Sequence, residues 1–365
     1  MRILVVSTWY PTQDAPFRTP FVTKHVRAIA RDHDVHVIHL QLLRDIAVSE
    51  ETFDGTSVTR VGFDPRKPLS MVRALGLIRR WATYSDVVHT MAFSSALVAA
   101  PAICHVPWVH TEHWNGVAFP RTIGAVWSNF AWVRHVLRLP TIVSGVSSLM
   151  NDALKPFARK GRVRTLGNVV DYAPSIEPRP ENESIRLISV GSLIERKNPV
   201  LTVETLSWLR SRGHEATLVW DGQGPLLEAA QQRARQLGVE DFVYFKGQRS
   251  GEQLREDLSE ANVFILLSST ETFCVAAAEA LAAGRPVVMG DVGGQKDFIK
   301  PSNGRMVREL TPSAVGQAVL DVIADPDLSS PEKMAREIRD QYGAASISDT
   351  LTNLYREALA VHSEH

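Results

Sequence analysis

The sequence predicts two consecutive α/β domains, each with a parallel sheet covered by helices on both faces. The chain has 365 residues, which is too long for one ordinary hydrophobic core. Short apolar runs alternate with segments of helical spacing in both halves. A proline-containing polar segment separates the halves. We therefore expect one domain over 1–172, a linker over 173–184 and a second domain over 185–345.

Short buried runs give the expected strands. In the first half they lie at 3–6, 35–40, 58–61, 87–88, 108–109 and 142–143. In the second half they lie at 185–190, 217–220, 242–245, 263–267 and 287–288. Ligands of such sheets bind beyond the carboxyl ends of the strands, and two such domains facing each other would leave a cleft as the natural pocket.

Composition limits the class of protein. Apolar residues make up 44% and charged residues 22%, which is typical of a globular chain. Lys+Arg and Asp+Glu are equal at 40 each, so a bulk attraction to nucleic acid is not indicated. Cys104 and Cys274 provide neither a disulfide framework nor a zinc site, and we expect a reducing, cytoplasmic setting. No apolar stretch approaches the roughly 20 residues of a bilayer span.

The most informative segment runs from Ser268 to Val288. An Ala-rich helix follows a strand there and ends at Gly284. The backbone N–H groups of Phe273, Cys274 and Val275, at the positive end of the helix dipole, form an anion site suited to a diphosphate. The carboxylates of Glu271 and Glu279 could accept hydrogen bonds from sugar and ribose hydroxyls. Taken singly, Glu271 reads as a solvated loop residue and Glu279 as a surface helix residue.

The joint pattern resembles the retaining glycosyltransferases of family four. Glu271, seven residues, Glu279 and then Gly284-Arg285-Pro286-Val287 match the hallmark of that family. The resemblance implies the GT-B fold, with two Rossmann-like domains facing each other across a cleft. It also implies a nucleotide-sugar donor, most often a UDP- or GDP-sugar, and a small-molecule, saccharide or lipid-linked acceptor. By the same resemblance, a helix over 346–365 crosses back to the first domain.

Further donor contacts follow from the resemblance. The loop after the first strand of the second domain contains Gly191, Ser192, Arg196 and Lys197, and it resembles the family's diphosphate loop. Lys197, helped by Arg196, would neutralise the leaving diphosphate and replace a metal ion, so no cofactor is expected. Ser192 stands where many relatives carry Arg. Two further turns resemble those that line the nucleotide, and they contain Gly222 and then Gly247 with Gln248.

The first half supplies fewer candidates. His113, in the segment His110-Thr111-Glu112-His113, matches a histidine that lies beside the transferred sugar in the family. We expect Lys197, Glu271 and His113 to be catalytic. The His-x-x-His spacing also allows a zinc site, but no third ligand is visible. Tyr10 and Arg18, in a loop resembling the family's first loop, are expected with His113 on the acceptor side.

Two readings of residues 123–139 are open. The segment is read first as a core helix with a lid or acceptor surface, and second as a basic amphipathic helix making weak peripheral membrane contact. Three functions also stay open: sugar transfer, nucleotide-sugar epimerisation and non-catalytic nucleotide-sugar binding. A dehydrogenase is disfavoured, since Ser7-Thr8-Trp9-Tyr10 replaces the Gly-x-Gly-x-x-Gly of a dinucleotide site. The oligomeric state is expected to be monomer or dimer.

Overall fold

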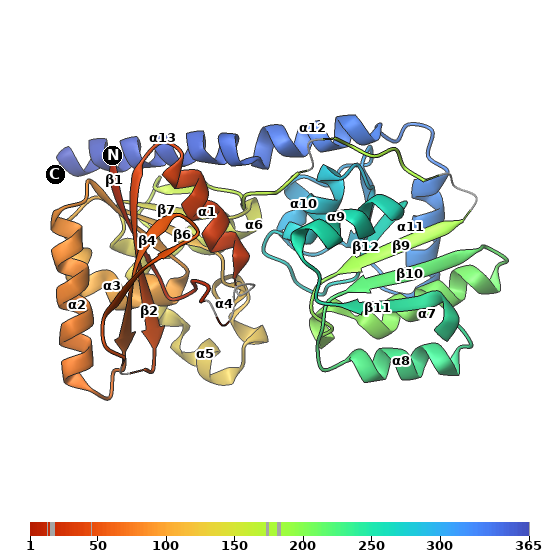
Figure 1. Ribbon diagram of the computed structural model, residues 1–365, viewed down its shortest axis with the longest axis horizontal. Helices are drawn as coiled ribbons and strands as arrows, with labels where there is room; N and C mark the ends of the chain where they lie inside the picture. Colours follow the sequence, from red (N-terminus) through yellow and green to blue (C-terminus); the bar gives the residue numbers. More distant parts are fainter. Residues whose placement is uncertain (13, 15–18, 45, 173–174, 181–183, 365) are drawn as a thin grey trace. The chain divides into compact units, whose positions relative to one another are not determined.

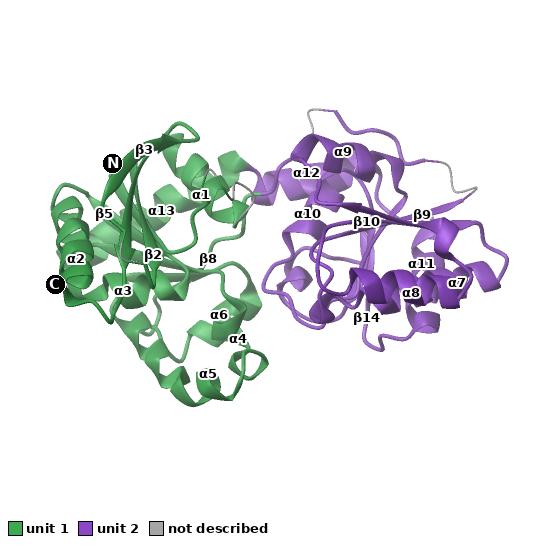
Figure 2. Cartoon of the chain, turned by 60° about the horizontal axis from the view of Figure 1, so that its bottom comes forward, with its two compact units in different colours: residues 1–169, 344–365 green, residues 170–343 purple. Residues whose placement is uncertain are grey.

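The computed structural model divides the chain into two compact units. It describes residues 1–365 except for 13, 15–18, 45, 173–174, 181–183 and 365. Unit 1 contains Met1–Val169 and Ala344–His365, and unit 2 contains Val170–Gly343 (Figure 2). The sequence had suggested changes of domain after residues 172 and 345. Part of the expected linker, 173–174 and 181–183, lies outside the described residues.

Unit 1 is built on an eight-stranded sheet with the order β3-β4-β2-β1-β5-β6-β7-β8. The strands are β1 (Arg2–Ser7), β2 (Asp34–Leu42), β3 (Ser49–Phe53), β4 (Thr56–Phe63), β5 (Val87–Met91), β6 (Trp108–Glu112), β7 (Ile142–Gly145) and β8 (Val163–Thr165). All neighbours pair in parallel except the edge strand β3, which forms an antiparallel hairpin with β4. The expectation of an all-parallel sheet was wrong for β3. Its polar sequence Ser-Glu-Glu-Thr-Phe lacks the apolar run of a buried strand, and it needs none at the solvated edge.

The helices of unit 1 cover both faces of this sheet (Figure 1). They are α1 (Pro20–Ala30), α2 (Pro68–Thr83), α3 (Phe93–Ile103), α4 (Asn115–Ala118), α5 (Ala125–Phe130), α6 (Ser148–Leu154) and α13 (Ala344–Ser363), with 3₁₀ turns η1 (Pro120–Thr122) and η2 (Ala131–Arg138). Successive side chains of β1 alternate between faces, and Leu4 and Val6 join a core with α2 and α3 side chains such as Ile78 and Ala96. Both faces are therefore buried, as parallel sheets require.

The preferred reading of residues 123–139, a core helix with a lid or acceptor surface, was wrong in expecting one helix, although Leu137 joins the core and Trp127, Val133 and Val136 pack against it. The segment forms the short α5 followed by η2, and its buried side chains are only Ala131 and Leu137. Val126, Phe130 and Trp132 are exposed. The chain changes from the α-helix α5 to the 3₁₀ turn η2 at Ala131, so the segment does not form one continuous α-helix.

The C-terminal helix α13 belongs to unit 1. Ser348 donates a hydrogen bond from its hydroxyl to Asp32 at 2.6 Å, next to the end of α1. The hydroxyl of Tyr355 lies 2.8 Å from Nδ1 of His89 on β5, and both side chains are buried. These contacts tie residues that are more than 250 positions apart in the sequence. Among the described helices, none has both the length and the apolar character that a membrane crossing requires.

Unit 2 contains a six-stranded parallel sheet with the order β11-β10-β9-β12-β13-β14. The strands are β9 (Ile185–Val190), β10 (Ala216–Asp221), β11 (Val243–Gly247), β12 (Val263–Leu266), β13 (Val287–Gly290) and β14 (Gly304–Val307). The helices are α7 (Pro199–Ser211), α8 (Leu227–Gln236), α9 (Gly251–Glu260), α10 (Val275–Ala282), α11 (Pro312–Ile323) and α12 (Pro331–Tyr342), with 3₁₀ turns η3 (Glu195–Lys197), η4 (Glu240–Phe242) and η5 (Gly294–Asp297).

The strand order reverses direction between β9 and β12 in unit 2. Chain order proceeds from β9 outward through β10 and β11, and then restarts at β12 on the other side of β9. The loops after β9 and β12 therefore leave the sheet side by side and diverge. This topological switch point is where open parallel sheets bind ligands. It is also where Lys197, Glu271 and the start of α10 lie in the sequence.

Candidate active site

The two loops at the switch point of unit 2 are joined by hydrogen bonds. The backbone N–H of Ser269 donates to the carbonyl of Arg196 at 2.8 Å. Asn198 takes a left-handed backbone conformation at the end of η3, and its amide nitrogen donates to the carbonyl of Leu267 at 2.7 Å. The structure thus brings the 196–197 loop directly against the segment that leads into α10.

Arg196 and Glu271 form an ion pair across these loops. A guanidinium nitrogen of Arg196 lies 3.0 Å from Oε1 of Glu271 and donates to the carbonyl of Thr270 at 2.6 Å. The hydroxyl of Ser268 also donates to Oε1 at 2.8 Å. The side chain of Glu271 is 11% exposed. The solvated-loop reading of Glu271 does not describe this geometry, because the carboxylate is held from two sides.

Lys197 lies against the backbone of Gly191. A Cβ atom on Gly191 would stand 2.0 Å from Nζ of Lys197, and Gly191 itself has φ of 138°. Gly222 packs in turn on Gly191, where a Cβ would lie 2.0 Å from the Gly191 carbonyl oxygen. Glycines at these two positions therefore let the strand ends and the lysine approach one another closely.

The N-terminus of α10 faces the same loops. Its N-cap residue, Cys274, is left-handed with φ of 69°, and no side-chain hydrogen bond caps the helix. Burial, and next the carboxylate of Glu271, raise the pKa of the Cys274 thiol to about 12, while Lys197 and Arg196 act in the opposite direction. The thiol is therefore neutral at physiological pH. Lys197 and Arg196 are therefore close enough to influence the charge state of the N-cap residue Cys274. The helix dipole also favours an anion at this position.

Packing fixes the start of α10. The buried ring of Phe273 contacts Phe298 and Tyr342, with centroids 5.2 and 5.0 Å away. The backbone N–H of Gly294 donates to the carbonyl of Glu271 at 3.1 Å, and a Cβ on Gly293 would lie 2.2 Å from that carbonyl. The Gly293-Gly294 turn thus supports the Glu271 loop from behind.

Glu279, on helix α10, lines a cavity of unit 2. The cavity has a volume of about 470 Å³. Glu279 shares its walls with side chains of α9 such as Leu254 and Arg255, and with Tyr172. A half-buried carboxylate in a largely apolar cavity can bind a hydroxylated ring whose flat faces are apolar.

The turns that contain Gly222 and Gly247 meet at the ends of β10 and β11. The N–H of Gly222 donates to the carbonyl of Gly247 at 2.7 Å, and Gly247 has φ of 72°. Gln248, the next residue, and Ser192 are exposed. The structure places both glycine turns at the carboxyl edge of the sheet, as the sequence predicts.

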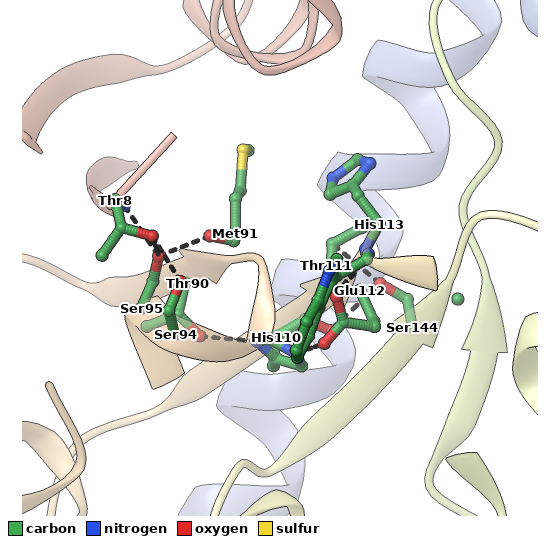
Figure 3. Close-up of polar contacts among 12 residues, drawn as sticks. Thr8, Thr90, Met91, Ser94, Ser95, His110, Thr111, Glu112, His113 and Ser144 are labelled. Carbon is green, nitrogen blue, oxygen red and sulfur yellow. Dashed lines mark hydrogen bonds and ion pairs between the residues drawn. The ribbon is translucent and has the colours of Figure 1, made fainter. Parts of the chain in front are cut away.

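In unit 1, His113 is buried beside the carboxyl ends of the strands. Figure 3 shows it directly after Glu112, whose Oε1 accepts the N–H groups of His113 and Trp114 at 2.8 and 2.7 Å. The ring of His113 packs on Phe21 and His25, with centroids 4.8 and 5.2 Å away. Burial, and less strongly the neighbouring histidines, hold the pKa of His113 well below its usual range. Its imidazole is therefore neutral at pH 7.

Figure 3 also shows a hydroxyl network around β1, β5 and β6. The hydroxyl of Thr8 lies 2.5 Å from that of Ser94, and Nδ1 of His110 lies 2.9 Å from the hydroxyl of Thr90. Nε2 of His110 is 3.3 Å from Glu112. Both ring nitrogens of His110 thus have protein partners.

Of the two other acceptor-side candidates, only Tyr10 can be placed. It is 1% exposed and packs edge-on against Phe53. It also lines a cavity of about 440 Å³ in unit 1, with polar neighbours such as Thr12 and Gln41. Arg18 lies outside the described residues.

Two family models match consecutive parts of the chain. The model of glycosyltransferase family 4 matches residues 21–173, and that of glycosyl transferases group 1 matches residues 175–341. The chain belongs to glycosyltransferase family 4. Each model covers most of one unit, and β1 and α13 lie outside both matches.

The chain is similar to several named proteins. Glycogen synthase of Mycobacterium tuberculosis is 28% identical over an alignment that covers 93% of this chain and 90% of that protein. An uncharacterised glycosyltransferase of Methanocaldococcus jannaschii is 25% identical, with 75% and 76% covered. The structure of sucrose-phosphate synthase from Thermosynechococcus elongatus superposes with a TM-score of 0.75 at 20% identity, covering 99% of both chains. This likeness shows that the glycosyltransferase has the GT-B fold.

Sequence reasoning missed a buried charge cluster beside Gly247. Asp257 on α9 accepts a hydrogen bond from Nε of Arg249 at 2.7 Å and also pairs with Lys246. Burial and the nearby Asp257 raise the pKa of Asp221 to about 7. The cluster braces both sides of the Gly247-Gln248 turn of the glycosyltransferase. The sequence does contain a signal for this cluster, because the charged residues Asp221 and Lys246 lie at the ends of two strands.

Replacing Gly191 by alanine tests the close packing of Lys197. We expect turnover by the glycosyltransferase to fall at least about tenfold, because the new Cβ displaces Nζ and strains a backbone at φ of 138°. The measurement is steady-state kinetics at saturating donor. The control is Gly213→Ala, which has a positive φ of 83° but nothing within 4 Å. A loss of turnover as large in the control would contradict the steric explanation.

The buried histidines of unit 1 predict a loss of stability in acid. Burial lowers the pKa of His25 to about 4, whereas an unfolded histidine titrates near 6.5. The unfolded state therefore binds more protons between these values, and stability falls as pH drops from about 6.5 towards 4. Urea unfolding of the wild type and of His25→Gln, at several pH values in this window, should show a smaller pH dependence in the variant. Equal slopes would refute the assignment to His25.

Proposed function

We propose that this glycosyltransferase binds a nucleotide-sugar in unit 2, with the donor diphosphate at the N-terminus of α10 and beside Lys197. One observation carries the proposal. The loop that contains Arg196 and Lys197 is hydrogen-bonded to the loop that precedes α10, through Ser269 and Glu271. Two cations and a helix N-terminus thereby converge within one rigid part of the sheet edge. That arrangement suits a doubly charged leaving group.

The chemistry follows from where charge develops. Breaking the bond between the anomeric carbon and the donor oxygen moves an electron pair onto the diphosphate. The Lys197 ammonium and the helix dipole stabilise that charge, so we propose that no metal ion is needed. The sugar ring becomes oxocarbenium-like. Glu271, oriented by Ser268 and Arg196, accepts hydrogen bonds from the sugar hydroxyls.

We propose a retaining outcome and a contact from His113 to the transferred sugar, both from family resemblance. The neutral imidazole of His113 suits a hydrogen-bonding role rather than that of a cation. The stereochemistry is read directly by NMR, from the anomeric configuration of the first-formed product. An inverted product, or unchanged kinetics in His113→Ala, would count against these two assignments.

We propose that the donor is a UDP-sugar or a GDP-sugar. Anabaena HepE, a structural neighbour at 16% identity with a TM-score of 0.74, was solved with UDP and glucose. A mannosyltransferase of Mycobacterium tuberculosis, 30% identical over 51% of this chain, is named as GDP-mannose-dependent. A thermal-shift screen with UDP, GDP and ADP, each with and without a chelator, should single out one base. The chelator should leave the shift unchanged, since a native-state ligand raises the melting temperature by binding alone.

Glu279 is proposed to bind the two ribose hydroxyls. Replacing Glu279 by glutamine should weaken binding of the preferred nucleoside diphosphate about tenfold, the size expected for hydrogen bonds to a charged group. The 2′-deoxy nucleotide should bind the wild type more weakly and should lose little further in the variant. Titration calorimetry of both proteins with both nucleotides gives four binding free energies. Their difference measures the coupling between the Glu279 carboxylate and the 2′-hydroxyl. Equal losses for both nucleotides would show that Glu279 does not contact the ribose.

A further inference from the structure

A buried carboxyl group lies at the end of β10, beside the two glycine turns of the proposed donor site. It belongs to Asp221, which is 3% exposed, and both of its oxygens are shielded from water. No N–H or O–H group of another described residue donates a hydrogen bond to either oxygen. A charged carboxylate would therefore lose its hydration without gaining donors in return. These surroundings favour the neutral acid over the charged form.

Asp257 on α9 is the charged neighbour that acts most strongly on Asp221. The side chain of Asp257 is also 3% exposed, and its two oxygens are occupied by cations. Lys246 pairs with Oδ1, and Nε of Arg249 donates to Oδ2 at 2.7 Å. Although burial raises the pKa of Asp257, the hydrogen bonds from these two cations outweigh burial and lower the pKa overall. Asp257 is therefore the charged member of the pair, and Asp221 is the one that carries the proton.

The remaining neighbours of Asp221 do not replace the missing donors. Lys246 and Arg249 act on Asp221 less strongly than Asp257 does, and both are already bound to Asp257. On the other side, β9 places the apolar Val190 in register with Asp221. With burial acting first and Asp257 next, the pKa of Asp221 is raised to about 7. A proton is therefore present on the pair in mild acid and is lost in mild alkali.

The end of β10 also connects the two turns through the backbone. The N–H of Gly191 donates to the carbonyl of Asp221 at 2.8 Å, in the loop that leads to Lys197. The N–H of Gly222, the next residue after Asp221, donates to the carbonyl of Gly247 at 2.7 Å. Strands β10 and β11 lie side by side at one edge of the sheet (Figure 1). How the side chain of Asp221 is held therefore affects both turns at once.

We propose that Asp221 is a positioning residue of the donor site that works in its protonated form, by donating a hydrogen bond from its carboxyl group to Asp257. The proton leaves Asp257 bound to Lys246 and Arg249, which fixes the turn at Gly247. When the proton is lost, two adjacent carboxylates compete for the same two cations and the turn loosens. An anionic diphosphate bound nearby favours the protonated form further, so donor binding takes up a proton and weakens as the pH rises. This inference rests on the donor site proposed for unit 2.

The pH dependence of donor affinity tests the proposal with the whole chain. UDP-glucose and GDP-mannose are the probes, because their doubly substituted diphosphates do not titrate in the range used. For the probe that binds, we expect the Kd to be at least about fivefold larger near pH ~8.5 than near pH ~6. Asp221→Asn, whose amide keeps a donor but cannot titrate, should abolish this difference. Asp321→Asn, at an exposed position of α11, should retain it. A wild-type pH dependence in Asp221→Asn would overturn the proposal.

Proton uptake separates a titrating group from a merely structural one. Titration calorimetry near pH ~7.5, in two buffers of different ionisation enthalpy, gives the number of protons bound together with the donor. The wild type should take up a fraction of one proton, and Asp221→Asn should take up none. Asp257→Asn should also lose the uptake, because Asp221 can then ionise and bind Lys246 and Arg249 itself. Equal uptake by the wild type and Asp221→Asn would contradict the proposal.

Unfolding of unit 2 tests the protonation without any donor. An aspartate in the unfolded chain titrates near about 3.9, whereas the pKa of Asp221 in the folded chain is about 7. The native state therefore binds more protons between these values, and the stability of unit 2 should fall with rising pH relative to that of Asp221→Asn. Hydrogen exchange in residues 170–343 measures this difference, and equal pH slopes would refute the protonated state. Unequal slopes, together with donor binding that survives Lys197→Ala, would refute the donor site instead.

Discussion

Lys197→Ala is expected to lower sugar transfer at least about 100-fold while leaving the melting temperature nearly unchanged. The ammonium is proposed to meet negative charge that develops on the leaving diphosphate, and loss of one such stabilising group typically costs 10²–10³ in rate, roughly. Lys197 contributes little to the fold, since the hydrogen bond from its ammonium to the Val190 carbonyl is long at 3.5 Å. Initial rates at saturating donor and a thermal melt measure the two effects.

The controls for Lys197 separate position from charge. Lys333 lies on α12 of the same unit and is exposed, so Lys333→Ala should leave the rate unchanged. Lys197→Arg keeps the charge but not the compact geometry against Gly191, and it should recover only part of the rate. A normal rate in Lys197→Ala would remove this residue from the reaction.

Arg285→Met is expected to be the most destabilising single change in unit 2. The Arg285 side chain is fully buried, and its guanidinium donates to the backbone carbonyls of Glu177, Pro178, Leu258 and Ser259 at 2.8–3.3 Å. Burial lowers its pKa to about 10, so it is still charged at neutral pH. Methionine would leave these buried and part-buried carbonyls without their donor, at a cost on the order of 3 kcal/mol.

The unfolding midpoint of unit 2 reports this cost. Urea unfolding followed by hydrogen exchange, which resolves the two units, should show the loss in residues 170–343 and little change in unit 1. Arg336→Met, at an exposed position of α12, should be close to neutral. A similarly small effect in Arg285→Met would mean that the guanidinium is dispensable. Arg285 would then be only the variable residue of the Gly-x-Pro-Val pattern, without a structural role.

The sequence predicted best the features that depend on local chemistry. The Glu271–Glu279 spacing, with Gly284 ending the helix, correctly located α10 and the loop before it. The strand-end glycines Gly191 and Gly222 were also placed at the sheet edge. In each case a short segment specifies both its conformation and its neighbours, through glycine permissiveness and helix termination.

Features that depend on distant partners escaped prediction. Nothing near Arg285 in the sequence indicates that its acceptors include the carbonyls of Glu177 and Pro178, more than 100 positions away. Similarly, only the fold shows that Val126, Phe130 and Trp132 are exposed while Leu137 is buried. The apolar content of the segment by itself favours burial. The structure shows that Leu137 is the side chain that enters the core.

The proposed donor site captures a pyrophosphate with the start of one helix and one lysine. A crystal structure with UDP or GDP, whichever the thermal-shift screen selects, tests it most directly. We predict that the β-phosphate lies within hydrogen-bonding distance of the backbone N–H groups at Cys274 and Val275 and of Nζ of Lys197. Phosphates bound elsewhere in unit 2, with Lys197 still lying on Gly191 and touching no ligand atom, would contradict it.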